Sequence, residues 1–337
     1  FSENLKKNSK LKKKNIYLKS PKVGIDDLNL DKYLGKKIQF DGIKNKPLIK
    51  SYFQKNNLNT NSLEKFNKFN YSIPIRPHDY KLINKEIKIK NYELHLTFMD
   101  VEKFNTNNFS NEFLSNCKFS IHAPDYCDNN NILDLFSENK KIRVKSEKLF
   151  LKCIQISRLL KNFNNQSNPI VISISQLPKN ENINNFYIKV KKYLFKLQKK
   201  FNVKIFPQWL PYYAWYFGGT HKIQVFSNPK DVIFLNKINL NICLDVSHFI
   251  LSANYFNLDA DYYFDRGKKI FKHFHISDAK GLDSEGIILG NGELLNKKFF
   301  KKLLKNDKTK VLETWEGHLN NCFNFKKDIK KIIEKIK

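Results

Sequence analysis

The spacing of hydrophobic and polar residues along this chain changes at about residue 71. From there to the C-terminus, short apolar segments alternate with longer amphipathic stretches. The apolar segments predict eight strands, at residues 73–76, 92–98, 119–123, 170–175, 203–206, 240–244, 271–276 and 310–313. Apolar positions at helical spacing predict helices over residues 143–161, 186–201 and 328–336. Strands that alternate with helices indicate a parallel sheet, and eight such units in roughly 260 residues favour a closed (β/α)8 TIM barrel of the α/β class.

The first fifty residues follow another pattern, in which glycine and proline interrupt short Lys-rich segments. We expect a small, irregular, β-rich module over residues 1–50. Residues 51–70 are polar and Asn-rich, and they suit a linker or a helix that leads into the barrel domain at 71–337. Because the chain starts at Phe1 rather than at Met, we expect it to be a piece of a longer polypeptide.

Nearly every predicted strand of the barrel ends in polar side chains. The carboxyl ends of barrel strands meet at one mouth, where active sites of this architecture lie. Carboxylates and imidazoles that converge there are costly to bury without partners, and a divalent cation removes that cost by coordinating them. The side chains concerned include Arg76, His78, His122, Gln208, Asp245, His248, His275, Glu313 and His318.

Single residues of this set permit other interpretations. A lone His such as His95 or His273 is more often a core residue than a ligand. Asp245 follows a buried strand, where it could instead cap a helix. His275 shares a strand face with His273 but lies nearer the C-terminal end, which makes it the better ligand. Glu313 follows an apolar segment, where a lone acid has little structural explanation.

The formal net charge of +29 resembles that of nucleic-acid-binding proteins. Arginine occurs at only four positions, however, and Asn, Ile and Phe are abundant, as in chains with a compositional bias towards Lys and Asn. We therefore interpret most lysines as solvated surface, with attraction of an anionic sugar phosphate as the alternative, and we expect no nucleic-acid partner. Five cysteines without a CxxC pair favour a reducing cytoplasm, and no apolar run reaches the length of a membrane span.

Four motifs at the strand ends resemble the xylose-isomerase-like barrel superfamily, which includes sugar isomerases, sugar 3-epimerases and endonuclease IV. "SIHAPDY" (120–126) looks like the His-Ala-Pro-Tyr strand of endonuclease IV. "CLDVSH" (243–248) is similar to a Leu-Asp-x-x-His strand, and "HFHISDAKGLDSEGIILGNGEL" (273–294) to a His-x-x-Asp segment with a Gly-rich loop. "VLETWEGH" (311–318) resembles the last strand of the epimerases. The resemblance covers about four fifths of the chain.

The resemblance to the epimerases implies a divalent metal, with Mn, Mg, Zn and Co left open. It places ligands at Asp245, His275 and Glu313, and we expect His248 as a further ligand. Glu313 would be both ligand and catalytic base. The epimerases have a second Glu at the end of strand five, where this chain has Gln208, so Glu285 or Asp278 would have to replace that base. Substrate contacts are expected from Arg76, His78, His122, Gln208, Trp209, Trp215 and His318.

An aromatic segment, "QWLPYYAWYFGG" (208–219), follows the fifth strand. We expect it at the barrel mouth, where Trp209 and Trp215 would stack on sugar rings. A hydrophobic plug or a subunit interface is the alternative, and a homo-oligomer is left open.

The N-terminal segment at residues 4–38 resembles the second half of the SAF, or antifreeze-like, domain that ends N-acetylneuraminate synthases. The Ser20-Pro21-x-x-Gly24-Ile25 turn and the Tyr33-Leu34-Gly35-Lys36 element carry this match. It implies a role in nonulosonic-acid or other surface-carbohydrate biosynthesis.

Three hypotheses follow from the sequence. The first is a metal-dependent isomerase or epimerase that acts on a sugar or sugar phosphate. The second is an endonuclease IV-like abasic-site nuclease, although residues 172–175 have no His on the fourth strand and Gln208 again replaces a Glu. The third is a non-catalytic sugar-binding barrel, which Gln208 favours.

Overall fold

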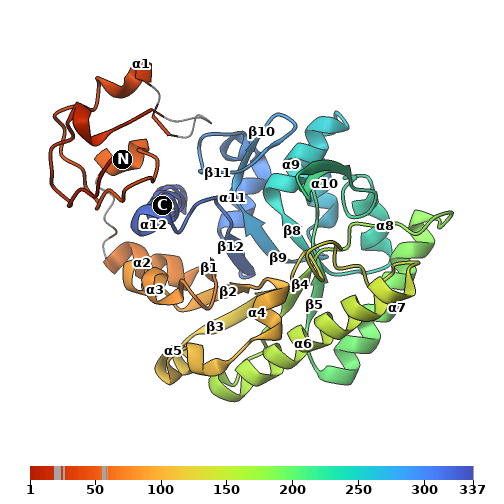
Figure 1. The fold of residues 1–337 in the computed structure, drawn as a ribbon. Helices are drawn as coiled ribbons and strands as arrows, with labels where there is room; N and C mark the ends of the chain where they lie inside the picture. The colour runs from red at the N-terminus through yellow and green to blue at the C-terminus, as the bar shows by residue number, and fades with distance from the viewer. Residues whose placement is uncertain (19–23, 26, 55–57, 59, 337) are drawn as a thin grey trace.

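The computed structural model describes residues 1–18, 24–25, 27–54, 58 and 60–336. Its centre is a barrel of eight parallel strands in the spatial order β5-β4-β3-β2-β1-β12-β9-β8 (Figure 1). The strands are β1 (Tyr71–Ile75), β2 (Asn91–His95), β3 (Lys118–His122), β4 (Ile170–Ile172), β5 (Ile205–Pro207), β8 (Ile242–Asp245), β9 (Phe271–Ile276) and β12 (Thr309–Leu312). A parallel bridge between Gln208 and Cys243 joins the two edge strands. The predicted barrel and its eight strands are confirmed.

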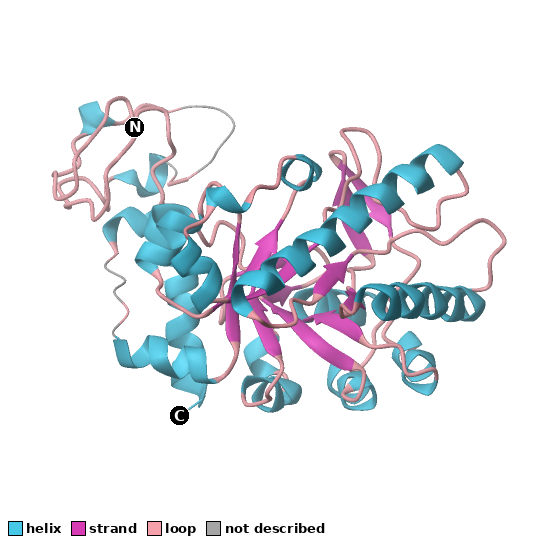
Figure 2. Ribbon diagram, turned by 90° about the horizontal axis from the view of Figure 1, so that it is seen from below, coloured by secondary structure: helices cyan, strands magenta, loops and turns pink. Residues whose placement is uncertain are grey.

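Helices surround this barrel on the outside (Figure 2). They are α3 (Tyr80–Glu86), α4 (Phe98–Glu102), α5 (Asn111–Asn116), α6 (Lys140–Asn164), α7 (Ile183–Phe201), α8 (Asp231–Lys237), α9 (Val246–Tyr255), α10 (Ala260–Gly267), α11 (Lys298–Leu304) and α12 (Leu319–Ile336), with 3-10 turns η3 (Thr106–Asn108) and η4 (Leu294–Asn296). The helices predicted at 143–161, 186–201 and 328–336 lie within α6, α7 and α12. Residues 320–322 have left-handed backbone angles, so the first turn of α12 is set apart from the rest.

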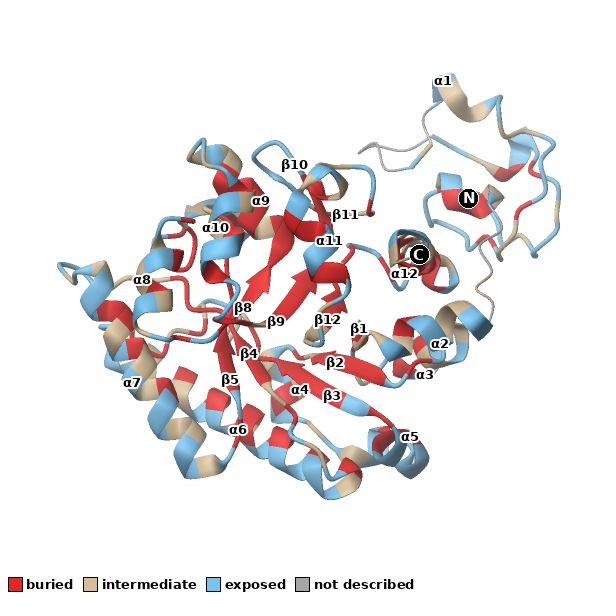
Figure 3. Ribbon diagram, turned by 180° about the vertical axis from the view of Figure 1, so that it is seen from behind, coloured by how far each residue is buried: buried red, intermediate tan, exposed pale blue. Residues whose placement is uncertain are grey.

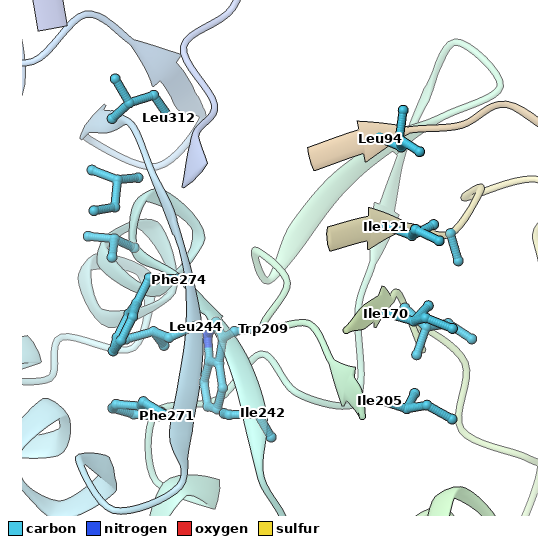
Figure 4. Packing of buried hydrophobic residues seen from close by; sticks show 14 of the residues in the cluster. Leu94, Ile121, Ile170, Ile205, Trp209, Ile242, Leu244, Phe271, Phe274 and Leu312 are labelled. Atoms are coloured by element: carbon cyan, nitrogen blue, oxygen red, sulfur yellow. The ribbon is translucent and has the colours of Figure 1, made fainter. Parts of the chain in front are cut away.

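The strands alternate between two environments, as a barrel covered by helices requires. Leu94, Ile121, Ile170, Ile205 and Ile242 point outward into the main core beneath the helices (Figure 4). Their neighbours along each strand point into the barrel, where Glu93, Ser120 and His273 contact one another across strands and Val171, Phe206 and Cys243 form a small apolar cluster. Figure 3 shows that the strands are buried almost throughout, whereas the helices expose their outer faces. The interior of the barrel therefore contains both an apolar cluster, at Val171, Phe206 and Cys243, and a group of polar side chains around Glu93.

Two antiparallel hairpins follow the carboxyl ends of barrel strands. β6 (Tyr213–Tyr216) pairs with β7 (Gly219–Lys222) after β5, and β10 (Asp278–Lys280) pairs with β11 (Ser284–Ile287) after β9. Both hairpins contribute residues to the cavity at this end of the barrel.

The N-terminal residues pack around an apolar cluster of their own, formed by Phe1, Leu11, Ile38, Leu48 and Tyr52. The described residues of 1–50 contain the short helices η1 (Lys13–Asn15) and α1 (Asp27–Leu30) but no strand, only the antiparallel bridges of Leu5 with Gly42 and Lys10 with Lys37. The expected β-rich module is thus held by isolated bridges, because its segments are too short to extend into ladders.

The segment between this module and the barrel is partly helical. It contains η2 (Lys50–Phe53) and α2 (Thr60–Lys68), which corresponds to the expected helix leading into the barrel. Phe66 on α2 is fully buried and stacks on Tyr71 of β1, with ring centroids 4.7 Å apart. Asn320 of α12 donates a hydrogen bond of 2.7 Å to Ser51.

All five cysteines are buried and unpaired. Within the described ranges, we find no helix whose length and apolar content would allow it to cross a membrane.

Candidate active site

A cavity of about 590 Å³ opens at the carboxyl ends of the barrel strands. Its walls come from the segments that follow β1, β2, β3, β5 and β12 and from the two hairpins. Because parallel strands all direct their carboxyl ends to one rim, polar residues that are far apart in the sequence meet at the floor of this cavity.

His275 lies fully buried beneath that floor, next to the lining residues Gln208 and Glu313. Its Nδ1 atom is 3.0 Å from Oε2 of Glu313 and 4.0 Å from Oδ2 of Asp245. The Nε2 atom of Gln208 is 3.1 Å from the same imidazole nitrogen and 3.3 Å from Oδ2 of Asp245. Asp245, His275 and Gln208 are buried, whereas the side chain of Glu313 is 17% exposed and faces the cavity. The sequence-based set of Asp245, His275 and Glu313 is therefore brought together, with Gln208 among them.

The spacing around His275 fits a divalent cation in part. Two ligands at about 2.1 Å from a tetrahedral metal lie roughly 3.4 Å apart, close to the 3.0 Å and 4.0 Å that separate Nδ1 of His275 from Glu313 and from Asp245. Among the described residues, the donor atoms of His122, His275 and Glu313 all lie within 4.8 Å of one another, whereas Asp245 belongs to no such group. Carboxylates and imidazoles form a donor set that Mn, Co, Zn or Mg accepts. Gln208 would add a ligand only after rotation of its amide, which exchanges Nε2 for Oε1.

A buried carboxylate, that of Glu93, contacts several imidazoles inside the barrel. Its Oε1 is 2.9 Å from Nε2 of His275 and 3.0 Å from Nε2 of His95, and its Oε2 accepts hydrogen bonds from Ser120 (2.6 Å) and pairs with Nε2 of His273 (2.8 Å). The contact with His275 is an ion pair whose angles do not make a hydrogen bond. Although burial alone would raise the pKa of Glu93, the imidazoles of His275 and His273 hold that pKa well below its ordinary value.

Glu93 contacts three site imidazoles, but the sequence-based set of site residues did not include it. It sits in the middle of β2 and not at its carboxyl end, where site residues were expected. The available signal was an acid flanked by Tyr92 and Leu94 inside a strand expected to be buried on both faces.

His248 joins two carboxylates instead of reaching the central donor cluster. Its Nδ1 is 3.2 Å from Oδ2 of Asp245 and 3.1 Å from the carbonyl oxygen of Trp209, and its Nε2 is 3.0 Å from Oε2 of Glu285. Burial opposes a charge here, but Asp245 and Glu285 raise the pKa of His248 to about 10. Asp245 also caps α9, because its Oδ1 accepts the backbone N–H of His248 at 3.1 Å. The cap interpretation of Asp245 is thus confirmed, and its ligand role stays a prediction.

The expected substrate contacts lie at different depths of the cavity. His122 is at the floor, with Nε2 2.8 Å from Oε1 of Gln208. Arg76, His78 and His318 line the rim, and Trp215 lines it with 63% of its surface exposed. Glu285 enters from the β10–β11 hairpin.

Trp209 does not line the cavity. Its side chain is fully buried in the core, packs on Phe249 with ring centroids 5.3 Å apart, and lies beside Leu244 and Ile242 in Figure 4. Since successive side chains of an extended segment point to opposite sides, the inward direction of Gln208 turns Trp209 outward. The expectation that Trp209 stacks on a sugar is therefore corrected.

Asp278, considered above as a replacement base, is fully buried, and its carboxylate is hydrogen-bonded to backbone N–H groups. Its carboxylate accepts hydrogen bonds of 2.8–3.0 Å from the N–H groups of Ala279, Gly290, Gly292 and Leu294. It organises the Gly-rich loop and does not line the cavity, which leaves Glu285 as the acid on that side.

No family model matches the sequence, and no curated protein matches it either. Solved structures do match in fold. A D-tagatose 3-epimerase-like protein has a TM-score of 0.51 at 15% identity, over 79% of this chain and 97% of its own. A 3-keto-D-glucoside 4-epimerase from E. coli has a TM-score of 0.52 at 10% identity (79% and 99%), and a putative xylose isomerase from Rhodospirillum rubrum one of 0.54 at 9% identity (79% and 99%). The chain thus shares its barrel fold with these solved structures.

Proposed function

We propose that this barrel is a divalent-metal-dependent isomerase or epimerase that acts on a sugar. The observation that carries the proposal is the position of Glu313 and Asp245 beside His275, on three adjacent strands or strand ends, together with donor atoms of His122, His275 and Glu313 that all lie within 4.8 Å of one another. The fold neighbours named as epimerases and isomerases are consistent with it.

Each residue has a distinct part in this proposal. A bound divalent cation supplies polarisation of the substrate's carbonyl oxygen. Glu313 faces the cavity beside His275, and it accepts the proton from the carbon next to that carbonyl. Gln208 cannot accept a proton, so an epimerisation, which returns the proton to the other face, uses Glu285 with its partner His248.

The proposal is tested by metal content and by proton exchange. Purified protein is expected to retain about one equivalent of Mn, Co, Zn or Mg. In D2O it is expected to incorporate deuterium next to the carbonyl of a ketose or aldose in a sugar panel, with loss of that exchange after chelation and in Glu313→Gln. Asp245→Asn should lose both metal and exchange, while Asp283→Asn, an exposed acid on the β10–β11 hairpin, should keep both. Exchange that persists in metal-free Asp245→Asn protein would falsify the proposal.

A non-catalytic sugar-binding barrel is the second candidate, because the amide nitrogen of Gln208 already lies within 3.3 Å of Asp245 and 3.1 Å of His275. In that case the amide connects the two groups without a cation. Saccharide binding that is unchanged by chelation, together with no exchange on any sugar, would favour this candidate.

For the N-terminal segment, we propose part of an SAF-like domain in a sialic-acid-type or other carbohydrate-biosynthesis protein. Of the matching turn, Ser20 and Pro21 lie outside the described residues, whereas Gly24 has a φ of +106° and the N–H of Ile25 bonds to Leu48. Gly35 has a φ of +76° and its N–H bonds to Leu11. The coding sequence upstream of Phe1 tests this proposal, since a synthase barrel there is the expected result and an unrelated sequence contradicts it.

A further inference from the structure

The cavity has no lysine among its described lining residues, although lysine provides almost all of the positive charge of this chain. Lys and Arg number 61 in total, and only four of them are Arg. Arg76 is the single side chain of either type that lines the cavity. Carboxylates are more numerous there: Asp79, Asp125, Glu285, Glu313 and Glu316. The lysines that give the protein its strong positive charge thus do not line this cavity.

Side chains cap two of the helices that begin at the cavity. A free helix N-terminus binds phosphate through its N–H groups and dipole. Thr97, however, caps α4 by accepting the N–H of Asp100 at 3.1 Å, and Asp245 caps α9. No described side chain caps α3, but the carboxylate of Asp79 at its start accepts the N–H of Arg76 at 2.7 Å and lines the cavity. A phosphate group near these three helices would therefore meet a cap or a carboxylate.

The cavity is larger than one sugar ring requires. Its volume of about 590 Å³ lies in the range that encloses drug-sized ligands, which is about the size of two sugar rings. Its polar floor, with His122, Gln208 and Glu313, takes up only the deepest part. The remaining space is bounded by the two hairpins and by the segment after β12.

Two tryptophans with exposed rings belong to that outer part. Trp215 on β6 is 63% exposed and Trp315, two residues beyond Glu313, is 60% exposed, and both line the cavity. Exposed indoles are costly to leave in water and offer flat apolar faces to a pyranose ring. Trp315 is held in place, because its backbone N–H donates a hydrogen bond of 2.8 Å to the carbonyl of Gly286 and its ring occupies the space that a Cβ at Gly286 would need.

From these features we infer that the substrate is an uncharged saccharide of at least two rings. Its first ring lies on the polar floor, and its second lies against Trp215, Trp315 or both. This inference rests on the proposed function, which places the reacting sugar ring at the polar floor. It narrows the substrate class from sugars and sugar phosphates to neutral glycosides, because, apart from the proposed cation and the histidines, Arg76 is the one positive group among the described lining residues, which include five carboxylates.

Tryptophan fluorescence and calorimetry of the full chain test the inference without turnover. The probes are cellobiose, maltose and lactose, the monosaccharides glucose and galactose, and glucose 6-phosphate. We expect at least one disaccharide to shift the emission of the exposed indoles and to bind about tenfold more tightly than its monosaccharides and than the phosphate. Its affinity should be the same at low and at high salt, because no charge pair contributes.

Single substitutions test which tryptophan contacts the second sugar ring. Trp215→Ala or Trp315→Ala should weaken the binding of the disaccharide about fivefold or more and leave that of the monosaccharide unchanged. Phe195→Ala removes a similarly exposed aromatic ring, 52% exposed on the outer helix α7, and should have no effect. Tighter binding of the phosphate, no binding of any disaccharide, or equal effects of the three variants would each overturn the inference. None of these results would change the metal content or the deuterium exchange that test the proposed function.

Discussion

The imidazole of His275 lies between two carboxylates, with Nε2 2.9 Å from Glu93 and Nδ1 3.0 Å from Glu313. Glu93 is fully buried inside the barrel, while Glu313 faces the cavity. A negative charge close to an imidazole stabilises its positive form. The other ring nitrogen, Nδ1, faces Glu313, Gln208 and Asp245.

Glu93→Gln should weaken metal binding although Glu93 is not itself at the cavity. The amide has no charge to offset the imidazoles, and its NH2 group faces ring nitrogens that need an acceptor. Loss of such a supporting carboxylate typically lowers metal affinity about 10- to 100-fold. Calorimetric titration with Mn or Co measures the change.

Ser120→Ala is the matched control, since it removes one hydrogen bond to the same carboxylate but no charge. It should cost about 1 kcal/mol of unfolding free energy and change metal affinity little. Equal losses of affinity in the two variants would show that packing, and not the charge of Glu93, matters.

Gln208→Glu should strengthen divalent-metal binding. It replaces a neutral amide beside Asp245 and His275 by an anionic donor, and affinity for hard cations rises with ligand charge. We expect about a tenfold gain in affinity. In the presence of a chelator, the melting temperature of the variant should fall below that of the parent protein. Without a bound cation, the additional buried carboxylate has no compensating positive charge.

The exposed Gln224→Glu makes the same charge change away from the site and should alter neither quantity. A Gln208→Glu protein with unchanged metal affinity would mean that residue 208 does not face the cation.

Gly286→Ala should displace Trp315. Gly286 has a φ of +66°, and a Cβ there would lie 2.2 Å from Cδ1 of the indole. The backbone strain costs about 1 kcal/mol, and the clash adds to it. Chemical unfolding should show the larger loss of stability, and titration with a disaccharide that the parent protein binds should show weaker binding.

Gly281→Ala on the same hairpin separates the two effects. It has a φ of +67° but nothing within 4 Å of the added Cβ, so it shares the strain without the clash. Its disaccharide affinity should equal that of the parent protein. Similar losses of affinity in both glycine variants would point to the hairpin backbone and not to Trp315.

The stability of the barrel should depend on pH through Asp328 of α12. Burial raises the pKa of this carboxyl to about 7, although it accepts hydrogen bonds from the Thr314 hydroxyl and the Leu289 N–H. In the unfolded chain an Asp titrates at about 3.9. Between about pH 4 and pH 7 the folded protein keeps a proton that the unfolded chain has released, so the contribution of Asp328 to stability falls as the pH rises through that window.

Asp328→Asn removes this titration. The free energy of unfolding of the parent protein minus that of the variant should decrease by up to about 1.4 kcal/mol per pH unit across the window and become constant above it. Urea unfolding at several pH values measures the difference. A difference that is independent of pH would place the titration elsewhere.

The sequence by itself determined the barrel and most of its rim. Apolar segments of strand length separated by amphipathic ones specify eight parallel strands, and parallel strands bring their carboxyl ends together whatever the details of packing. Asp245, His275 and Glu313 could therefore be placed at one site before any coordinates. The same argument selected Gln208, which follows a strand end, whereas Glu285 was named only as a replacement for the base that Gln208 lacks.

Tertiary structure decided which way each side chain points and what lies beneath the rim. Trp209 and Gln208 are neighbours in sequence, but only the packing of the helices against β5 and β8 shows that the indole is in the core and the amide at the site. Glu93 pairs with His273, 180 residues away, through a contact that no local pattern records. The local sequence fixes strand spacing, whereas the partners of a buried charge depend on which strands meet across the barrel interior.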